Sequence, residues 1–257
     1  MTAFVHSEVR RGVATLTLDS PTNRNALSSA LIEQLRIALD EAQRNDGVRV
    51  IVLGHAGPVF SSGADLTETA AALETGTPPV NRLGEVLAAI WESTKPVVAR
   101  VGGAARAGGL GIIAAADIAI CSREATFAFT EVRIGVIPAV ISSTVLPRIS
   151  PRAAAELYLT GAVFDGDRAA EIGLVTAAVD STELDATVTH YAATLVRGAP
   201  GALAGAKLLL RRDRAASLRE ELEVLTEMSV AYFGSEEGRE GMAAFREKRD
   251  PRWVPEG

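Results

Sequence analysis

Two turns that contain glycine are the segments of this chain best suited to chemistry. The first runs from Phe60 to Leu66 with the sequence FSSGADL, and the second from Ala105 to Gly111 with the sequence ARAGGLG. The local pattern predicts that each turn follows a buried strand and opens a helix, where the first backbone N–H groups have no partner within the helix. Glycine lets a ligand approach such N–H groups closely, and the helix dipole favours negative charge there. The two turns therefore predict an anion or oxyanion site built from backbone groups.

Known phosphate-binding patterns do not explain these turns. Gly103 and Gly108 have P-loop spacing, but Gly109-Leu110 stands where Lys-Ser/Thr is required, and neither turn contains GxGxxG. A purely structural alternative is that both are tight turns needed for close packing. Two such turns in one chain favour an oxyanion site.

Composition excludes several classes of function. The chain has 257 residues and a formal net charge of −6, whereas nucleic acids and anionic membranes attract a basic face. A lone Cys121 excludes an internal disulfide framework, and His6, His55 and His190 lack the spacing of paired metal ligands. No apolar run reaches the length of about 18–20 residues that a membrane span needs. We therefore expect a cytoplasmic protein that uses no metal and contacts neither nucleic acid nor membrane.

Elements that would position the two turns can be read from hydrophobic periodicity. The pattern predicts a hairpin around Arg11-Gly12, then a helix, a buried strand, a loop and a second helix that starts near Ala64. Further strands and a helix follow up to residue 121, and helices dominate after Pro151. The predicted strands are 4–9, 13–18, 48–54, 96–101, 118–121 and 174–179, and the main predicted helices are 27–42, 107–116, 184–197, 200–212 and 218–233.

This order predicts an α/β core domain over residues 1–195 and a helical C-terminal region over residues 196–257. The stretch 73–79, rich in Gly, Thr and Pro, is expected to be a loop within the core domain and not a linker between domains.

Several segments, in order along nearly the whole chain, resemble the crotonase (enoyl-CoA hydratase/isomerase) family. The resemblance implies an α/β fold, a crotonase-like spiral of ββα units with a helical C-terminal trimerisation region, assembled as a homotrimer or a hexamer. It also implies an acyl-CoA thioester substrate, so coenzyme A belongs to the substrate and no separate cofactor is expected. The matching segments are 23–27 (NRNAL), 60–66, Gly108-Gly109 with Asp117, 131–138 and 243–249 (AAFREKR).

The family match implies roles for individual residues. Backbone N–H groups at Ser62 and Gly108 would polarise the thioester carbonyl as an oxyanion hole, and Glu131 would transfer protons. The substrate and its CoA moiety would be bound by Arg24, Ala26, Ser62, Gly63, Ala64, Asp65, Leu66, Gly108, Phe245 and Lys248. For Lys248, a solvated charge in a charge-rich tail is an equally good reading.

One position departs from the family pattern. Hydration in the two-carboxylate manner uses paired glutamates, and the first of them corresponds here to Gly111. Glu131 matches the second, where burial in an apolar cleft would raise its pKa towards a useful range. A surface salt bridge between Glu131 and Arg133 is the structural alternative. Glu68, on the helix after the first turn, could lend a second carboxylate, but an exposed helix charge explains it better.

The sequence leaves the reaction open between two types. The segments around Gly108 and Glu131 resemble a hydratase-like branch associated with methylglutaconyl-CoA-type substrates, which favours a lyase that adds water to a 2-enoyl-CoA. A single glutamate, however, suits a 3,2-enoyl-CoA isomerase, in which one base moves a proton from C2 to C4. We rank the hydratase first and the isomerase as its alternative.

Three further functions compete with these two. They are a non-catalytic acyl-CoA binder, a thioester hydrolase or decarboxylase, and a ClpP-like serine protease, which has a similar fold but needs a serine beside a histidine base.

Overall fold

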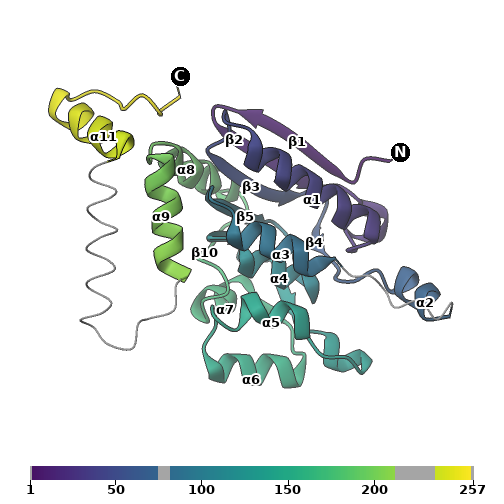
Figure 1. The fold of residues 1–257 in the computed structure, drawn as a ribbon. Coiled ribbons are helices and arrows are strands. Elements are labelled where there is room, and N and C mark those ends of the chain that lie inside the picture. Colours follow the sequence, from purple (N-terminus) through teal and green to yellow (C-terminus); the bar gives the residue numbers. More distant parts are fainter. Residues whose placement is uncertain (1, 75–81, 212–234, 256–257) are drawn as a thin grey trace, which may run out of the picture.

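The strands of the chain form two sheets in the computed structural model, which describes residues 2–74, 82–211 and 235–255 (Figure 1). The larger sheet has the order β1-β2-β3-β5-β7-β10, and the smaller one has the order β4-β6-β8-β9. The larger sheet contains β1 (Val5–Arg10), β2 (Val13–Leu18), β3 (Val50–His55), β5 (Val97–Val101), β7 (Ile118–Ser122) and β10 (Ala177–Val179). The smaller contains β4 (Val59–Ser61), β6 (Ala104–Arg106), β8 (Thr126–Ala128) and β9 (Phe164–Asp165).

The chain alternates between the two sheets in a repeating unit. Each unit places one strand in the larger sheet and the next in the smaller sheet, and a helix follows. The units are β3-β4 with α2 (Leu66–Glu74) and α3 (Leu83–Glu92), β5-β6 with α4 (Gly108–Ala115), and β7-β8 with the 3-10 helix η2 (Glu131–Ile134) and α5 (Ala139–Val145). The pairs β4-β6 and β6-β8 are parallel, as are β3-β5 and β5-β7. The predicted spiral of ββα units is confirmed.

The faces of the larger sheet are buried against different helices, as strand pleating requires. Alternate side chains such as Leu16, Ile51 and Val97 face α1 (Ser29–Arg44), α3 and α4, which lie side by side in Figure 1. The intervening residues, such as Val52 and Val98, pack against α8 (Leu184–Val196) on the opposite face. The alternation explains why β3, buried on both sides, reads as a continuous apolar run.

The remaining described elements follow the core. A 3-10 helix, η1 (Pro21–Asn23), precedes α1, and α6 (Pro151–Thr160) and α7 (Gly166–Glu171) follow α5. Within residues 196–257, the structure describes α9 (Pro200–Arg211) and α11 (Glu236–Glu247). The boundary between 195 and 196 stays a prediction. Across the described residues, no helix combines the length and the apolar character that crossing a membrane would require.

Most of the predicted elements are confirmed, and the elements that were not predicted are the short strands and the helices α5, α6 and α7. The hairpin, the strands of the larger sheet and the helices at α1, α4, α8 and α9 are present at the expected places. Strands β4, β6, β8 and β9, with two or three residues each, were not predicted, since such short pieces have no measurable alternation. The predicted loop at 73–79 falls largely, and the helix at 218–233 entirely, outside the described residues.

Candidate active site

Three predicted site segments meet at one edge of the smaller sheet. Residues 62–65 follow β4, Gly108 follows β6 after one residue, and Glu131 follows β8 after two residues. These strands are parallel neighbours in the order β4-β6-β8, so their carboxyl ends share one edge of the sheet. Gly108 therefore lies between the first turn and Glu131. The repeat that builds the fold is also what brings the three segments together.

The two glycine turns touch through positions where a side chain would not fit. A Cβ atom at Gly63 would lie 3.0 Å from the Cβ of Ala107, and one at Gly109 would lie 2.9 Å from the Cβ of Ser61. A Cβ at Gly108 would come within 2.7 Å of a Leu27 methyl group. Glycine at these positions thus serves close approach of the two turns, which is the packing explanation. Close approach also places the two turns side by side.

Hydrogen bonding distinguishes the N–H groups of the first turn. The N–H of Ser62 donates to the carbonyl of Arg24 at 3.1 Å, and the N–H of Leu27 donates to the carbonyl of Gly63 at 2.8 Å. Within the described residues, the N–H groups of Ala64 and Gly108 have no hydrogen-bond acceptor. Ala64 is exposed, and Gly108 is the first residue of α4. The free donors that the two turns offer are therefore those of Ala64 and Gly108, whereas the Ser62 N–H is already engaged.

Backbone strain marks the start of α4. Ala107, immediately before the helix, has φ 46° and ψ −117°, a conformation that costs a non-glycine residue of order 1–3 kcal/mol. Its N–H donates to the carbonyl of Ala128 on β8 at 3.2 Å, which holds it in place. This strained residue turns the chain so that the N-terminus of α4 points out of the smaller sheet, beside the first turn.

Glu131 carries a buried carboxylate oxygen without a partner. The residue is 9% exposed, and its Oε2 atom is buried with no hydrogen-bond partner among the described residues. Burial raises the pKa of Glu131 above its ordinary value, and a hydrogen bond from its own backbone N–H offsets part of the rise. In the described part of the chain it forms no ion pair; Arg133, its proposed salt-bridge partner, packs against Gly161 instead.

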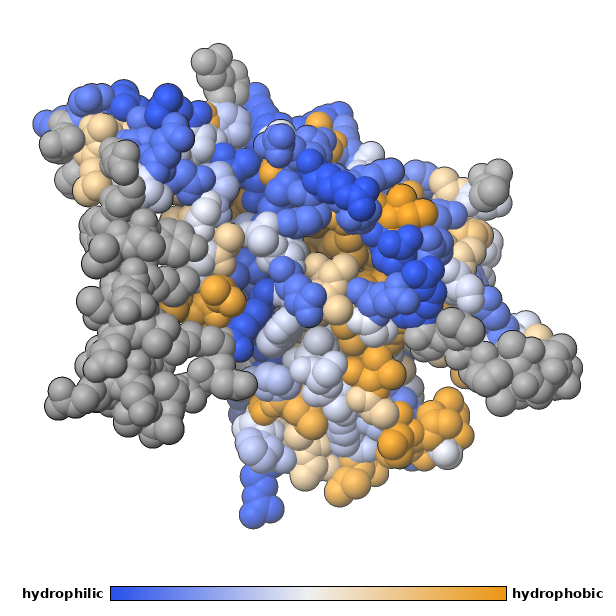
Figure 2. Space-filling model, viewed as in Figure 1, coloured by the Kyte–Doolittle hydropathy of each residue, from blue (hydrophilic) through white to orange (hydrophobic). Residues whose placement is uncertain are grey.

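Polar and apolar side chains surround this glutamate. The ring of Tyr158 on α6 lies 4.6 Å from that of Phe129, two residues before Glu131, and the Tyr158 hydroxyl is 3.4 Å from Ser142 Oγ. Near Glu131 in sequence, Ile134, Val136, Ile137 and Val140 are exposed. Figure 2 shows apolar side chains gathered around α5 and α6 on the face viewed.

At Gly111, the position of the missing glutamate, a neighbouring helix fills the space that a side chain would need. A Cβ atom there would lie 2.5 Å from the Cγ2 and 2.9 Å from the Cβ of Ile141 on α5. The hydroxyl of Thr144 on the same helix donates to the Gly111 carbonyl at 3.0 Å. Since Ile141 fills this space, a second carboxylate has no room at position 111. Sequence reasoning identified the absence but not Ile141, because the contact between α4 and α5 has no local signal.

Other acidic residues near the first turn have structural partners. Glu68 accepts a hydrogen bond from the backbone N–H of Ser29 at 2.8 Å, so its carboxylate stabilises the N-terminus of α1. Asp65 accepts from the N–H groups of Thr67 and Glu68 at 3.1 and 3.2 Å and so caps α2. Neither carboxylate replaces the missing glutamate in this arrangement.

The residues predicted to bind CoA divide into two groups. Arg24 is exposed and Ala26 is buried, and both precede α1 beside residues 62–66. Lys248 is exposed at the end of α11, and the side chain of Phe245 lies outside what the structure describes. Figure 1 places α11 at the opposite side of the molecule from α2. Within one chain, Lys248 is therefore not brought to the first turn.

The histidines and serines do not form a nucleophilic site in the described residues. His55 is buried, accepts a hydrogen bond from the N–H of Gly102 at 2.9 Å, and has its pKa lowered by burial and by nearby Arg100. The Ser62 hydroxyl donates to the Asn23 carbonyl. Across the residues described, no group of three or more His, Cys, Asp or Glu side chains is arranged to hold a metal ion.

A comparison with known proteins identifies the family of the chain. The sequence model of the family described as "Enoyl-CoA hydratase/isomerase" matches residues 8–256. The chain belongs to this family. The family description covers both hydratases and isomerases, so membership shows the fold and the enzyme family without choosing the reaction.

The relatives of the chain include proteins named as enoyl-CoA hydratases and a protein named as a dienoyl-CoA isomerase. It is 33% identical to the "Probable enoyl-CoA hydratase" of Bacillus subtilis, over 95% of this chain and 96% of that protein. It is 32% identical to a peroxisomal Δ(3,5)-Δ(2,4)-dienoyl-CoA isomerase of Arabidopsis thaliana, over 93% and 91% of the two chains. The crystal structure of an enoyl-CoA hydratase from Mycobacterium avium is 44% identical, covers 98% of this chain and all of its own, and superimposes with a TM-score of 0.74.

Proposed function

We propose that the chain binds acyl-CoA thioesters and stabilises their enolates with the N–H groups of Ala64 and Gly108. A thioester carbonyl seated between the two free donors would gain negative charge at its oxygen when a proton leaves C2. Fixed backbone dipoles stabilise that charge without reorganising, which is why such donors contribute so much to rate. The free N–H of Ala64 supports it as the donor of the first turn in place of Ser62.

Glu131 is the base in this proposal. It lies at the same edge of the smaller sheet as both donors, and its unpartnered Oε2 is free to take a proton. A raised pKa brings the carboxyl closer to the acidity at which proton transfer in both directions is efficient. The exposed apolar residues that follow Glu131 suit an acyl group next to the reacting carbons.

The reaction best supported by the geometry is movement of a double bond from the 3 to the 2 position of an enoyl-CoA. The observation behind this choice is the filled space at Gly111, since Ile141 leaves Glu131 as the single carboxylate of the site. One carboxylate suffices here: Glu131 removes a proton from C2, the enolate forms at the two N–H groups, and the same carboxyl returns the proton to C4. No oxidant, metal or separate cofactor is required for these steps.

Hydration of a 2-enoyl-CoA is the second candidate, and the relatives named as hydratases favour it. The family implies two carboxylates for the simple form of this reaction, so Glu131 would have to activate water alone. Methylglutaconyl-CoA-type substrates belong to this second candidate. A non-catalytic acyl-CoA binder is disfavoured by the buried, unpartnered Glu131.

A direct test separates the two reactions. The purified protein would be supplied with a 3-enoyl-CoA or a 2-enoyl-CoA, while the absorbance of the conjugated thioester is followed and the products are identified. Appearance of the conjugated signal from the 3-enoyl substrate is expected. Its loss from the 2-enoyl substrate, with 3-hydroxyacyl-CoA as product and no isomerase activity, would make the chain a hydratase.

The proposal extends to the oligomeric state and the cellular location of the protein. A homotrimer or a dimer of trimers could bring Lys248 of a neighbouring chain towards the CoA moiety, since the chain's own Lys248 lies elsewhere. We also propose a cytoplasmic location, from the sequence composition alone.

A further inference from the structure

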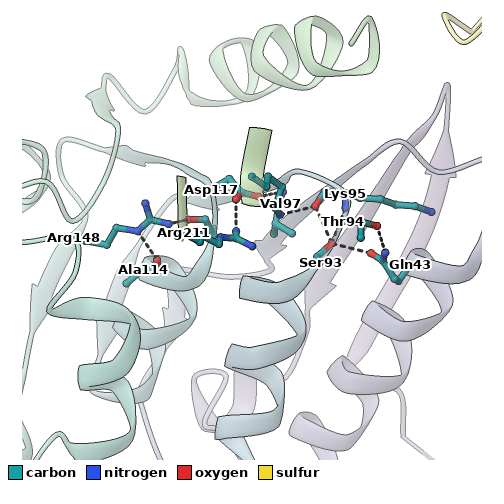
Figure 3. A network of polar contacts seen from close by, with 11 residues as sticks. Gln43, Ser93, Thr94, Lys95, Val97, Ala114, Asp117, Arg148 and Arg211 are labelled. Atoms are coloured by element: carbon teal, nitrogen blue, oxygen red, sulfur yellow. Dashed lines mark hydrogen bonds and ion pairs between the residues drawn. The ribbon is translucent and has the colours of Figure 1, made fainter. Parts of the chain in front are cut away.

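A half-buried acidic residue, Asp117, lies just beyond the C-terminal end of the helix that provides the Gly108 N–H. Asp117 follows the C-terminal end of α4 and is 15% exposed. Its carboxylate accepts hydrogen bonds from the Val97 N–H at 2.8 Å and from Lys207 Nζ at 2.5 Å, and it pairs with the guanidinium of Arg211. Lys207 and Arg211 belong to α9 and are 7% and 13% exposed. Figure 3 shows Arg211 beside Asp117 in this network.

A third cation completes the network from the other side. Arg148 donates to the carbonyls of Ala114 and Ala116 at 3.1 Å each, and these carbonyls end α4 (Figure 3). The guanidinium groups of Arg148 and Arg211 both lie over the ring of Trp91, 4.9 and 5.0 Å from its centroid. A cation at the C-terminus of a helix is favoured by the helix dipole and satisfies carbonyls that lack partners within the helix.

The helix between this network and the proposed site is short and fully enclosed. All eight residues of α4, from Gly108 to Ala115, are buried. Eight residues span about 12 Å, which is little more than two turns. Its N-terminus is fitted tightly against Leu27 and Ser61 through Gly108 and Gly109. We expect a displacement at its C-terminal end to reach the Gly108 N–H over this short distance.

We propose that Arg148 and Arg211 are positioning residues, which fix α4 from its C-terminal end and so align the Gly108 N–H for the reaction. The proposal rests on the function proposed above for Gly108. In this proposal α9, which lies outside the ββα core, influences the reaction through the positive charge that it supplies to Asp117.

The electrostatics explain how α9 acts on α4. With Lys207 and Arg211 present, the Asp117 carboxylate is neutralised, and Arg148 remains free to hold the two helix carbonyls. Without Arg211, one oxygen of the Asp117 carboxylate loses its partner, and Lys207 is left as the cation from α9 that balances it. Arg148, whose charge also interacts with Asp117, is then drawn from the helix carbonyls towards the carboxylate. The pKa of Lys207, which burial lowers to about 8, records the cost of keeping this cation inside the protein.

Substitutions of the two arginines test the proposal. The variants are Arg148→Met, Arg211→Met, the double variant, and Arg211→Lys, which keeps the charge. Arg168→Met is the control for the loss of a paired arginine, because Arg168 on α7 forms ion pairs with Glu156 and Glu171 and none with Asp117. Steady-state kinetics with the enoyl-CoA substrate and amide hydrogen exchange of α4 are measured for each variant.

Each methionine variant is expected to lower kcat roughly 10-fold or more, as small misplacements of catalytic groups do, with KM changed by less than about twofold. The double variant should be no slower than the slower single one, since both act through one helix. Amides of α4 should exchange faster in both methionine variants, and Arg211→Lys should recover most of kcat. Arg168→Met should leave both measurements unchanged.

Unchanged kcat in folded variants, or effects that multiply in the double variant, would overturn the proposal. Equal exchange of α4 amides in wild type and variants would do so as well. Hydrogen exchange needs no substrate, so this arm still decides the positioning role if the wild-type protein turns over no enoyl-CoA. That last result would instead contradict the proposed function.

Discussion

Ile141 occupies the space into which a side chain at Gly111 would have to extend. A Cβ at position 111 would lie 2.5 Å from Ile141 Cγ2, well inside van der Waals contact. Gly111 belongs to α4, which is buried throughout, and Ile141 on α5 is only 2% exposed. The packing of α5 against α4 therefore leaves no room for a second carboxylate at position 111. This relationship underlies the choice of a one-carboxylate reaction.

Adding a side chain at position 111 should destabilise the protein unless Ile141 is made smaller. Gly111→Ala forces overlap in a tightly packed core, and the expected loss is about 1–3 kcal/mol of unfolding free energy. In Gly111→Ala with Ile141→Ala, the overlap is gone, so the added alanine should cost less than it does alone. Denaturant unfolding of the four proteins measures this coupling. Equal effects of Gly111→Ala in both backgrounds would show that Ile141 does not fill the site.

Glu131→Gln should abolish most of the enoyl-CoA activity. The amide cannot accept the C2 proton, and a positioned base contributes typically about 10²–10⁴ to the rate. Glu68→Gln is the matched control: its carboxylate caps α1, so it should change stability slightly and kcat little. A comparable loss of kcat in both variants would refute the assignment of Glu131 as the only carboxylate that reacts.

As the pH is lowered, the rate should begin to fall at a pH above the ordinary pKa of a glutamate. Glu131 must be ionised to remove the C2 proton, and burial raises its pKa from 4.5. As pH is lowered through this raised pKa, the folded protein takes up a proton at Glu131 and kcat/KM decreases. The acid limb of the kcat/KM profile in wild type measures that pKa in the free enzyme. A limb at or below pH 4.5 would contradict a buried Glu131 as the base.

Removing the N–H of Ala64 should affect the reaction more than removing the Ser62 hydroxyl. Ala64→Pro eliminates one of the two free donors, and loss of one such donor costs about 10²–10³ in kcat in other enzymes. Ser62→Ala keeps both free donors and should retain most of the activity. Kinetics are compared after circular dichroism shows that both variants are folded. Retained activity in a folded Ala64→Pro protein would return the donor role to Ser62 or to another group.

The sequence predicts the longer elements of the fold well and the short ones poorly. Strands with five or six residues, such as β2 and β3, have enough alternation or apolar content to be recognised. Strands β4, β6 and β8 have three residues each, and they are the ones that align the site. Their pairing is set by contacts between successive repeats, which no local window contains.

Site residues were predictable where the backbone conformation limits the residue type. Gly63 and Gly108 could be recognised because only glycine fits between the two turns. Glu131 was identified through the family match. Which N–H of the first turn is free could not be inferred, because it depends on the bond from Ser62 to Arg24, 38 residues earlier in the chain. The filling of position 111 by Ile141 depends in the same way on tertiary packing.

The fate of the proton that Glu131 removes tests the account most directly. A 3-enoyl-CoA carrying deuterium at both C2 positions would be converted in a single turnover in ordinary water, and the deuterium at C4 of the 2-enoyl product measured by mass spectrometry or NMR. Since Oε2 of Glu131 is buried without a partner, part of the label should appear at C4, carried there by the same carboxyl. Formation of the 2-enoyl product with only solvent hydrogen added at C4, or formation of a 3-hydroxyacyl-CoA instead, would contradict a single-carboxylate isomerase.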